Sequence, residues 1–351
     1  MIWLTWRQFR TQAWVALAAL AVLAVGLGTT GLHLVHLYDA NAVPACRAAG
    51  DCAPAAAHFL NQVQATGGYA DLYQAGIVVL YVVPALIGAF WGAPLVTREL
   101  ETGTLRLAWT QSISRTRWLA VKLGLVGLAS MATAGLVSLL VTWWAAPVDR
   151  AGTLAGSGQR VDLDVLGRFS PVLFGARGIT PVGYAAFAFA LGVTAGVLIR
   201  HTLAAMAASL VIFTGIQLAF ALWIRAHLIA PLRSSRPFDP AQITTLSNSS
   251  DGQFIVAAKV TRPGDWILAN QTVTAAGHVF TGPAPAACVS DSASFQQCQR
   301  ALGALHLRQL VTYQPASRYW TLQWTETAIF LALALTLAGL CYWRARRRHL
   351  A

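Results

Sequence analysis

Six long apolar runs divide this chain of 351 residues. A helix needs about 20 such residues to cross a hydrocarbon layer of about 30 Å. None of the six runs contains Asp, Glu, Lys, Arg or His. The runs are residues 13–32, 75–97, 123–145, 181–199, 203–224 and 327–343. We therefore predict an all-α polytopic membrane protein with six transmembrane helices, embedded in the lipid bilayer.

The charge content of the chain supports the same class. Only 11% of the residues are charged, whereas soluble domains carry about 25%. In a soluble protein, the formal net charge of +12 would suggest nucleic-acid binding. Here the charge is better explained by membrane topology, so we expect no nucleic-acid partner.

Basic residues are unevenly distributed between the two sides of the predicted bundle. The side that holds both termini carries twelve: Arg7, Arg10, Arg98, Arg106, Arg115, Arg117, Lys122, Arg200, Arg344, Arg346, Arg347 and Arg348. The two short loops on the other side hold Arg47 and four further Arg. Because short cytoplasmic loops are enriched in Lys and Arg, we predict a multi-pass protein of the plasma membrane with both termini in the cytoplasm.

Two segments outside the spans have their own character. Residues 1–12 combine Trp3 and Trp6 with Arg7 and Arg10, which indicates a short helix in the cytoplasmic interface. The alternative is an ordinary basic flank of the first span. Residues 225–326 are mixed in composition and include strand-like runs at 254–260 and 272–274, so we predict a small folded extracellular cap.

Four of the five cysteines form two closely spaced pairs in the predicted outer segments. Because that side is oxidising, we predict the disulfides Cys46–Cys52 and Cys288–Cys298. Four unpaired thiols are the alternative. Cys341 lies at the inner end of the last span and is expected to stay reduced.

The link between the second and third spans, residues 98–122, is long for a connection between neighbouring helices. It holds the only acids on the predicted cytoplasmic side, Glu99 and Glu101. Its mixed charge and periodic Leu favour a docking element for a soluble partner over a solvated loop whose acids balance nearby Arg. Within the spans, Gly88 and Gly92, and Gly192 and Gly196, have the four-residue spacing that lets helices approach closely.

The link resembles that of the ABC-2 type permeases, the membrane subunits of ATP-binding-cassette exporters. The resemblance rests on a pattern of an acid, Gly-Thr, Leu, Ser-Arg and a Lys entering the third span. The matching positions are Glu99, Gly103, Thr104, Leu105, Ser114, Arg115 and Lys122. The run from Tyr313 to Trp320, followed by Gln323 and Glu326, resembles the entry to the sixth span in actinobacterial members.

This resemblance implies a separate ATPase subunit that binds ATP and Mg²⁺ and docks on the link, while this chain binds no cofactor. The residues expected to couple to it are Glu99, Glu101, Thr102, Gly103, Thr104 and Arg106. It also implies that two copies pair as a homodimer around a cavity lined by the second and fifth spans. The candidate cavity residues are Phe90, Trp91, Phe213, Thr214, Gln217 and Phe220. Thr214 and Gln217 could instead bond a neighbouring helix.

The leading hypothesis is thus the permease subunit of an ATP-driven exporter of a hydrophobic or amphipathic cargo, such as a drug, a peptide or a lipid. The chain has no Gly-Lys-Ser/Thr phosphate loop, so it is not expected to hydrolyse ATP itself. The alternative is an ion-coupled secondary transporter of six spans, which needs ionisable groups that the six runs lack. An intramembrane enzyme or a metal site would need ligand or nucleophile sets that are also missing from the runs.

Overall fold

The computed structural model describes residues 2–48, 52–101, 115–155, 167–248, 254–260, 262, 264–289 and 294–347. The chain forms two compact units. We call Met1–Leu228 together with Trp320–Ala351 the membrane unit, and Ile229–Tyr319 the inserted unit. The inserted unit covers fewer residues than the predicted cap of residues 225–326, because the helices before and after it continue beyond the apolar runs.

The described part of the membrane unit contains six helical segments that are long and apolar enough to span a membrane, as predicted. Two of them contain a π-helical turn. The segments are α1 (Ile2–Ala40); α3 (Tyr69–Leu86) with the π-helix η2 (Ile87–Gly92) and α4 (Pro94–Glu101); α6 (Arg115–Ala155); α8 (Thr180–Ile199); α9 (Thr202–Ala219) with the π-helix η4 (Phe220–Ile224) and α10 (Arg225–His227); and α13 (Tyr319–Arg347).

Residues 2–12 are the first turns of α1 and do not form the separate interfacial helix that the sequence predicts. The uninterrupted helix has a physical reason, because no Gly or Pro occurs before Gly26 to break it. Phe9 is buried, whereas Trp3 and Trp6 are exposed. The amphipathic segment therefore packs as part of the bundle.

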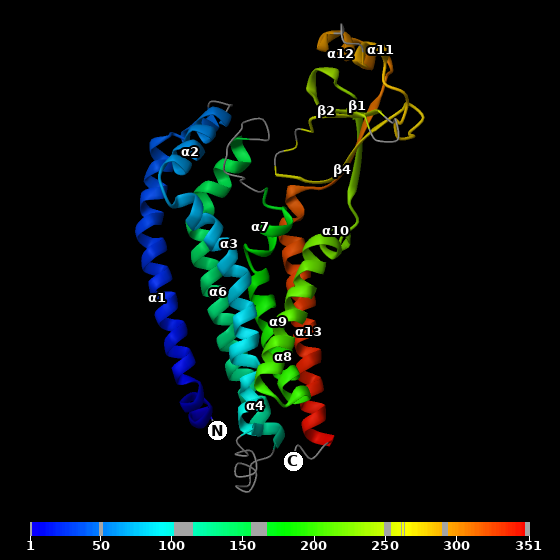
Figure 1. Ribbon diagram of the computed structural model, residues 1–351. Helices are drawn as coiled ribbons and strands as arrows, with labels where there is room; N and C mark the ends of the chain where they lie inside the picture. Colours follow the sequence, from blue (N-terminus) through cyan, green and yellow to red (C-terminus); the bar gives the residue numbers. More distant parts are fainter. Residues whose placement is uncertain are drawn as a thin grey trace. The chain divides into compact units, whose positions relative to one another are not determined.

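The two ends of the membrane unit differ. At one end α4 finishes and α6 and α9 begin, and we call this the basic end because Arg98, Arg117 and Arg200 lie there. The first helix starts and the last helix finishes at the same end (Figure 1). At the other end, the loop end, the short helix α7 (Pro171–Gly175) precedes α8.

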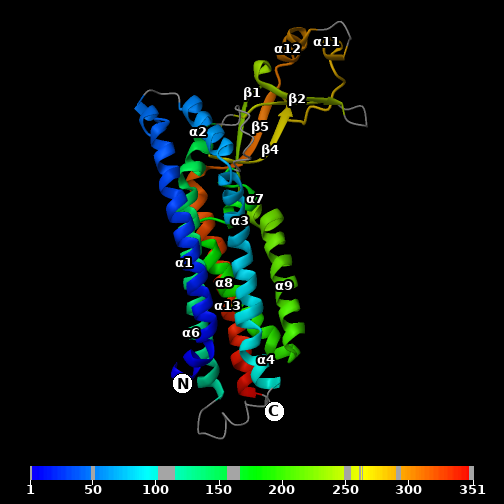
Figure 2. The ribbon, with the colours of Figure 1, turned by 60° about the vertical axis from the view of Figure 1, so that its left-hand side comes forward.

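Helix α8 lies at the centre of the membrane unit, with α3, α6, α9 and α13 around it (Figure 2). All but one of its residues from Thr180 to Val197 are buried. It approaches η2 very closely, since a Cβ atom on Gly192 would lie 2.1 Å from the carbonyl oxygen of Gly88. A Cβ on Gly92 would lie 2.6 Å from the carbonyl oxygen of Phe189. The prediction that these glycines serve internal packing is confirmed.

Helix α2 (Ala53–Ala65) was not expected from the sequence. It lies in the predicted first outer loop and buries Phe59, Leu60 and Val63 in a core shared with α1, α3 and α6. The predicted disulfide Cys46–Cys52 is present and leads into this helix.

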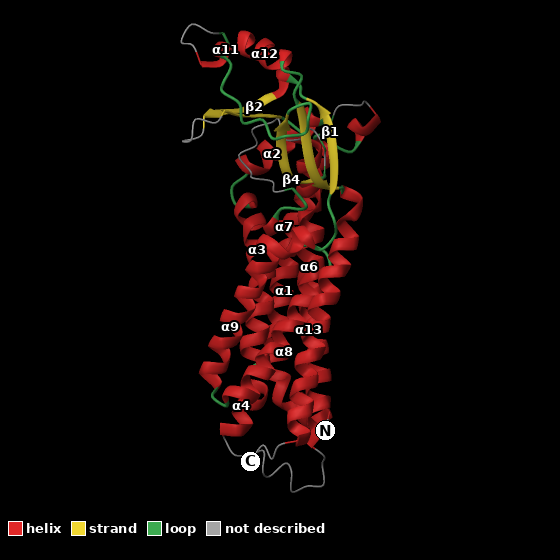
Figure 3. Cartoon of the chain, turned by 90° about the vertical axis from the view of Figure 1, so that its right-hand side faces the viewer, coloured by secondary structure: helices red, strands yellow, loops and turns green. Residues whose placement is uncertain are grey.

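The inserted unit mixes strands and helices, and the prediction of an all-α polytopic membrane protein with a small separate domain between the fifth and sixth spans is confirmed. Its three-stranded antiparallel sheet has the order β1-β5-β4, and β2 pairs with β3 (Figure 3). Phe238, Phe254, Val256 and Leu302 are buried in its core. The predicted disulfide Cys288–Cys298 joins the helices α11 and α12.

These elements of the inserted unit are β1 (Leu232–Pro237), β2 (Ile243–Asn248), β3 (Phe254–Ala258), β4 (Trp266–Val273), α11 (Ala286–Val289), α12 (Phe295–Ala304) and β5 (Arg308–Gln314). The two strand-like runs of the sequence correspond to β3 and to the end of β4.

Candidate functional site

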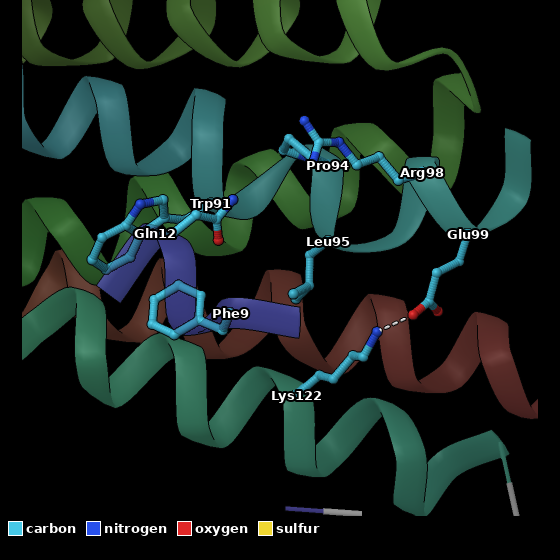
Figure 4. A pocket seen from close by; sticks show the side chains of 8 residues that line it. All are labelled: Phe9, Gln12, Trp91, Pro94, Leu95, Arg98, Glu99 and Lys122. Carbon is cyan, nitrogen blue, oxygen red and sulfur yellow. Dashed lines mark hydrogen bonds and ion pairs between the residues drawn. The ribbon is translucent and has the colours of Figure 1, made fainter. Parts of the chain in front are cut away.

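The predicted coupling acids lie at the basic end, on the last turns of α4. Glu99 forms an ion pair with Lys122 of α6, and both side chains are largely buried. Figure 4 shows the Glu99 carboxylate directed at the Lys122 ammonium group beside a small pocket of about 210 Å³. The Lys122 ammonium also lies 4.5 Å from the ring centre of Trp118. The pocket is lined by Phe9, Gln12, Trp91, Pro94, Leu95, Arg98, Glu99 and Lys122.

Glu101 connects the same helix to the start of α9. One carboxylate oxygen accepts the backbone N–H of Thr202 at 2.8 Å, and the other accepts the Thr202 hydroxyl at 2.9 Å. The first N–H groups of a helix lack partners within the helix, so this carboxylate satisfies one of them. The backbone hydrogen bond from Thr202 lowers the pKa of Glu101 below its ordinary value. The hydroxyl oxygen of Thr202 also lies 2.8 Å from the hydroxyl oxygen of Thr97 on α4.

The two acids are therefore bonded within the chain, and their coupling to an ATPase stays a prediction. Glu99 ties α4 to α6, and Glu101 ties α4 to α9. The other predicted coupling residues, Thr102, Gly103, Thr104 and Arg106, lie outside the described residues.

The six predicted cavity residues do not line one cavity in a single chain. Phe213, Gln217 and Phe220 are buried. The two phenylalanines belong to a core with Phe187 and Phe330 of the central and last helices. Thr214 is exposed, because it lies one position away from the buried side of α9.

Phe90 and Trp91 line a different space, an apolar groove of about 690 Å³ between α1 and the second span. One alternative for Gln217 was a hydrogen bond to a neighbouring helix, and its side-chain oxygen makes no such bond within the described part of the chain. Its Oε1 atom is buried and has no hydrogen-bond partner among the described groups.

A buried ion pair that the sequence analysis missed lies at the loop end. Arg225 donates from Nε to Glu326 at 2.8 Å and from Nη2 at 3.0 Å. The two side chains are 1% and 0% exposed. The Tyr184 hydroxyl also donates to Glu326, and Arg225 donates to the Pro171 carbonyl at 2.9 Å. The guanidinium carbon lies 4.4 Å from the ring centre of Phe174.

This cluster joins the ends of three spans to the loop before α8. Buried charges inside a membrane segment are costly and mark functional positions. The sequence analysis placed both residues just outside the apolar runs and counted Glu326 only as part of the entry to the sixth span. The available signal was the presence of single opposite charges at the ends of two adjacent runs.

Further polar contacts stabilise the same loop end. Gln323 accepts the backbone N–H groups of Ile179 and Thr180 at 3.1 and 3.2 Å. Asp149 accepts from Arg177 at 3.0 Å and from the Tyr73 hydroxyl at 2.7 Å. Within the described part of the chain, no group of three His, Cys, Asp or Glu side chains could hold a metal ion.

The arrangement of spans and charges can be compared with known proteins. The sequence model of the ABC-2 membrane transporter related family matches residues 17–225. The chain belongs to this family. The match covers the first five spans and both acids of α4, and it ends before the inserted unit and α13. No curated protein and no solved structure matches the chain.

Membership of this family defines the general role of the chain, which we call the permease. It is a multi-pass membrane component of an ABC transporter and not itself the ATPase. The family match says nothing of the inserted unit, which lies beyond its last residue.

Proposed function

We propose that this permease moves a hydrophobic or amphipathic substrate out of the cell, driven by a separate ATPase subunit that binds ATP and Mg²⁺. Two copies pair as a homodimer, and the ATPase docks on the link between α4 and α6. The basic end faces the cytoplasm, so that both termini lie inside, as the distribution of Lys and Arg favours.

The observation that carries this proposal is the pair of bonds that hold α4. In the sequence, the link follows directly on the last residue of α4, and α6 follows the link. A force on the link therefore acts first on a helix that is bonded to α6 through Glu99 and Lys122, and to α9 through Glu101 and Thr202. Coupling between two sites needs one shared element that both can bias, and α4 has the contacts for that role.

The central helix receives the same displacement. Helix α4 continues directly from η2, and η2 packs against α8 through glycines with no side chains between the backbones. Because such a contact has no flexible side chains to absorb movement, η2 and α8 are expected to move together.

The alternative of an ion-coupled transporter needs an intramembrane group that can gain and lose an ion. Arg225 and Glu326 are the strongest candidates, because both lie within span-forming helices. Yet both oxygens of the Glu326 carboxylate already accept hydrogen bonds from Arg225, and one also accepts the Tyr184 hydroxyl. Because both groups are already bonded to each other across two helices, the pair is better suited to joining helices than to binding a transported ion.

The proposal is tested in proteoliposomes that hold the permease together with a candidate ABC ATPase subunit from the same genome. The measured quantity is vanadate-sensitive ATP turnover with and without an amphipathic fluorescent dye. We expect Glu99→Gln and Gly103→Val to lower dye transport and dye-stimulated turnover together, by about tenfold or more, at normal membrane abundance. The matched control is Asp39→Asn, the same acid-to-amide change at an exposed residue on α1.

Full transport in both variants would refute the coupling role of the link. ATP turnover by the permease alone, without a co-purified ATPase, would refute the division of labour between the two subunits. Loss of abundance without loss of activity per molecule would show that the link is only structural.

A further inference from the structure

The apolar groove between α1 and the second span has polar groups at one end. It has a volume of about 690 Å³. One wall is formed by α1, the other by α3 and η2, and the floor includes Thr133 and Val137 of α6. The Thr133 hydroxyl bonds its own helix, donating to the carbonyl of Ala129 at 2.9 Å. Along most of its length, the groove therefore offers no free polar group.

The groove exists because of the residues that line α1. Ala16 and Ala19 face it, and their small side chains leave space where longer ones would fill the gap. From Val15 to Leu23 the lining extends about 12 Å along the helix axis. One leaflet contributes about 15 Å of the hydrocarbon core, so the groove spans most of one leaflet. A single acyl chain is the natural occupant of a space with this length and chemistry.

At the basic end of the groove, α1 and η2 are in contact. Pro94 has no N–H, so the carbonyl of Phe90 four residues earlier lacks its helical donor. Gln12 supplies the missing donor, with its Nε2 atom 3.1 Å from the Phe90 oxygen. Beside it, the rings of Phe9 and Trp91 meet edge to face with their centres 4.9 Å apart.

The polar lining residues at this end are Thr11, Gln12 and Arg98. Figure 4 shows Gln12 on α1 and Arg98 on α4 on either side of Trp91 and Pro94. Arg98 is exposed, and its cationic fork suits a phosphate group. Arg7 and Arg10 on the first turns of α1 are exposed at the same end. The groove thus combines an apolar channel with a cationic mouth.

We propose that this groove binds an anionic phospholipid, with one acyl chain along Ala16 and Ala19 and the phosphate at Arg98. The charge of the mouth selects an anionic headgroup over a zwitterionic one. With the orientation given under the proposed function, the mouth lies at the cytoplasmic leaflet, where anionic lipids attract juxtamembrane basic residues. The site itself does not depend on transport, so it can be tested on the permease alone.

The test is native mass spectrometry of the purified full chain in detergent, incubated with equal amounts of phosphatidylglycerol and phosphatidylcholine that carry identical acyl chains. We expect the wild type to retain phosphatidylglycerol preferentially. Arg98→Gln should lower its retention about tenfold while phosphatidylcholine is unchanged, because a charge-assisted phosphate contact is lost. Arg98→Lys keeps the charge and should keep most of the preference. Arg346→Gln, which removes a charge from the basic end of α13, is the matched control.

A second variant tests the chain-binding part of the groove. Ala19→Phe fills the space and should lower the retention of both lipids. Equal retention of the two lipids by the wild type would overturn the proposal, as would equal effects of Arg98→Gln and Arg346→Gln. If Ala19→Phe lowered the dimer fraction or dye binding but left lipid retention unchanged, the occupant would be a second copy or the transported substrate, and the proposal would be wrong.

Discussion

The buried pair Arg225–Glu326 offers the sharpest test of how the membrane unit is held together. We consider the single substitution Glu326→Gln, which keeps the shape of the side chain and removes its charge. In the wild type, Glu326 accepts two N–H groups of Arg225 and the hydroxyl of Tyr184. In the variant, the guanidinium remains buried without its counter-ion, although it keeps its contacts with the Pro171 carbonyl, the Tyr184 hydroxyl and the Phe174 ring.

The size of the effect follows from this burial. Removing one partner of a buried ion pair costs about 3–5 kcal/mol, because an uncompensated charge stays behind. At about 2–4 °C per kcal/mol for a domain of this size, the melting temperature should fall by about 6–20 °C. The double variant Arg225→Met/Glu326→Leu should lose less, about 1–3 kcal/mol, since no charge is stranded and the main cost is the unpaired hydroxyl of Tyr184.

The assay is thermal unfolding of the purified permease in detergent, followed by circular dichroism. Glu101→Gln is the matched control, since it makes the same change at an exposed carboxylate of α4. The control should lower the melting temperature far less than Glu326→Gln. A single variant that unfolds at the wild-type temperature, or a double variant that is less stable than Glu326→Gln, would refute the reasoning about the buried charge.

Three further predictions follow from the structure. Gly192→Ala should destabilise the permease by about 1–3 kcal/mol, because its Cβ would meet the Gly88 backbone. Gly124→Ala places its Cβ in open space and should be neutral or stabilising. Melting curves of the two variants, recorded side by side, test this difference. Non-reducing peptide mapping should recover the Cys288–Cys298 linkage, and two free thiols there would contradict it. The lowered pKa of Glu101 means that its bonds stabilise the fold above the ordinary carboxyl value and lose this effect as the pH falls through the lowered pKa. The difference in melting temperature between wild type and Glu101→Gln should therefore be constant from about pH 6 to 9 and shrink in acid; a difference that grows in acid would contradict this.

The parts of the fold that the sequence predicted are those with a strong local signal. Six apolar runs identify six spans because length and composition suffice for that purpose. The two disulfides follow from short spacing, and the packing role of Gly88 and Gly192 follows from small residues at helical periodicity. Each of these signals lies within a few turns of one segment.

The parts that the sequence did not predict depend on contacts between distant segments. Glu99 and Lys122 are 23 residues apart, and Arg225 and Glu326 are separated by the whole inserted unit. No periodicity shows which charges will meet across such separations. The boundary of an apolar run also hides a charge that a helix carries inward, which is why Arg225 was assigned to the cap.

The candidate cavity illustrates a different limit. Aromatic and polar residues on two spans were grouped by composition, but the rotation of each helix decides which way they face. On α9 this rotation buries Phe213 and Gln217 and exposes Thr214 between them. The π-turns η2 and η4 change that rotation by inserting residues into the helical repeat, and the apolar pattern contains no mark of them.

The proposed function requires that an ATPase docks on the link between α4 and α6. Its most direct test is site-specific photo-crosslinking in membranes that contain both subunits. A photoreactive amino acid at position 106, in the link, should give a covalent adduct with the ATPase. The same amino acid at position 233, in β1 of the inserted unit, should give none. An adduct from position 233, or none from position 106 in a complex that retains ATP turnover, would contradict the claim.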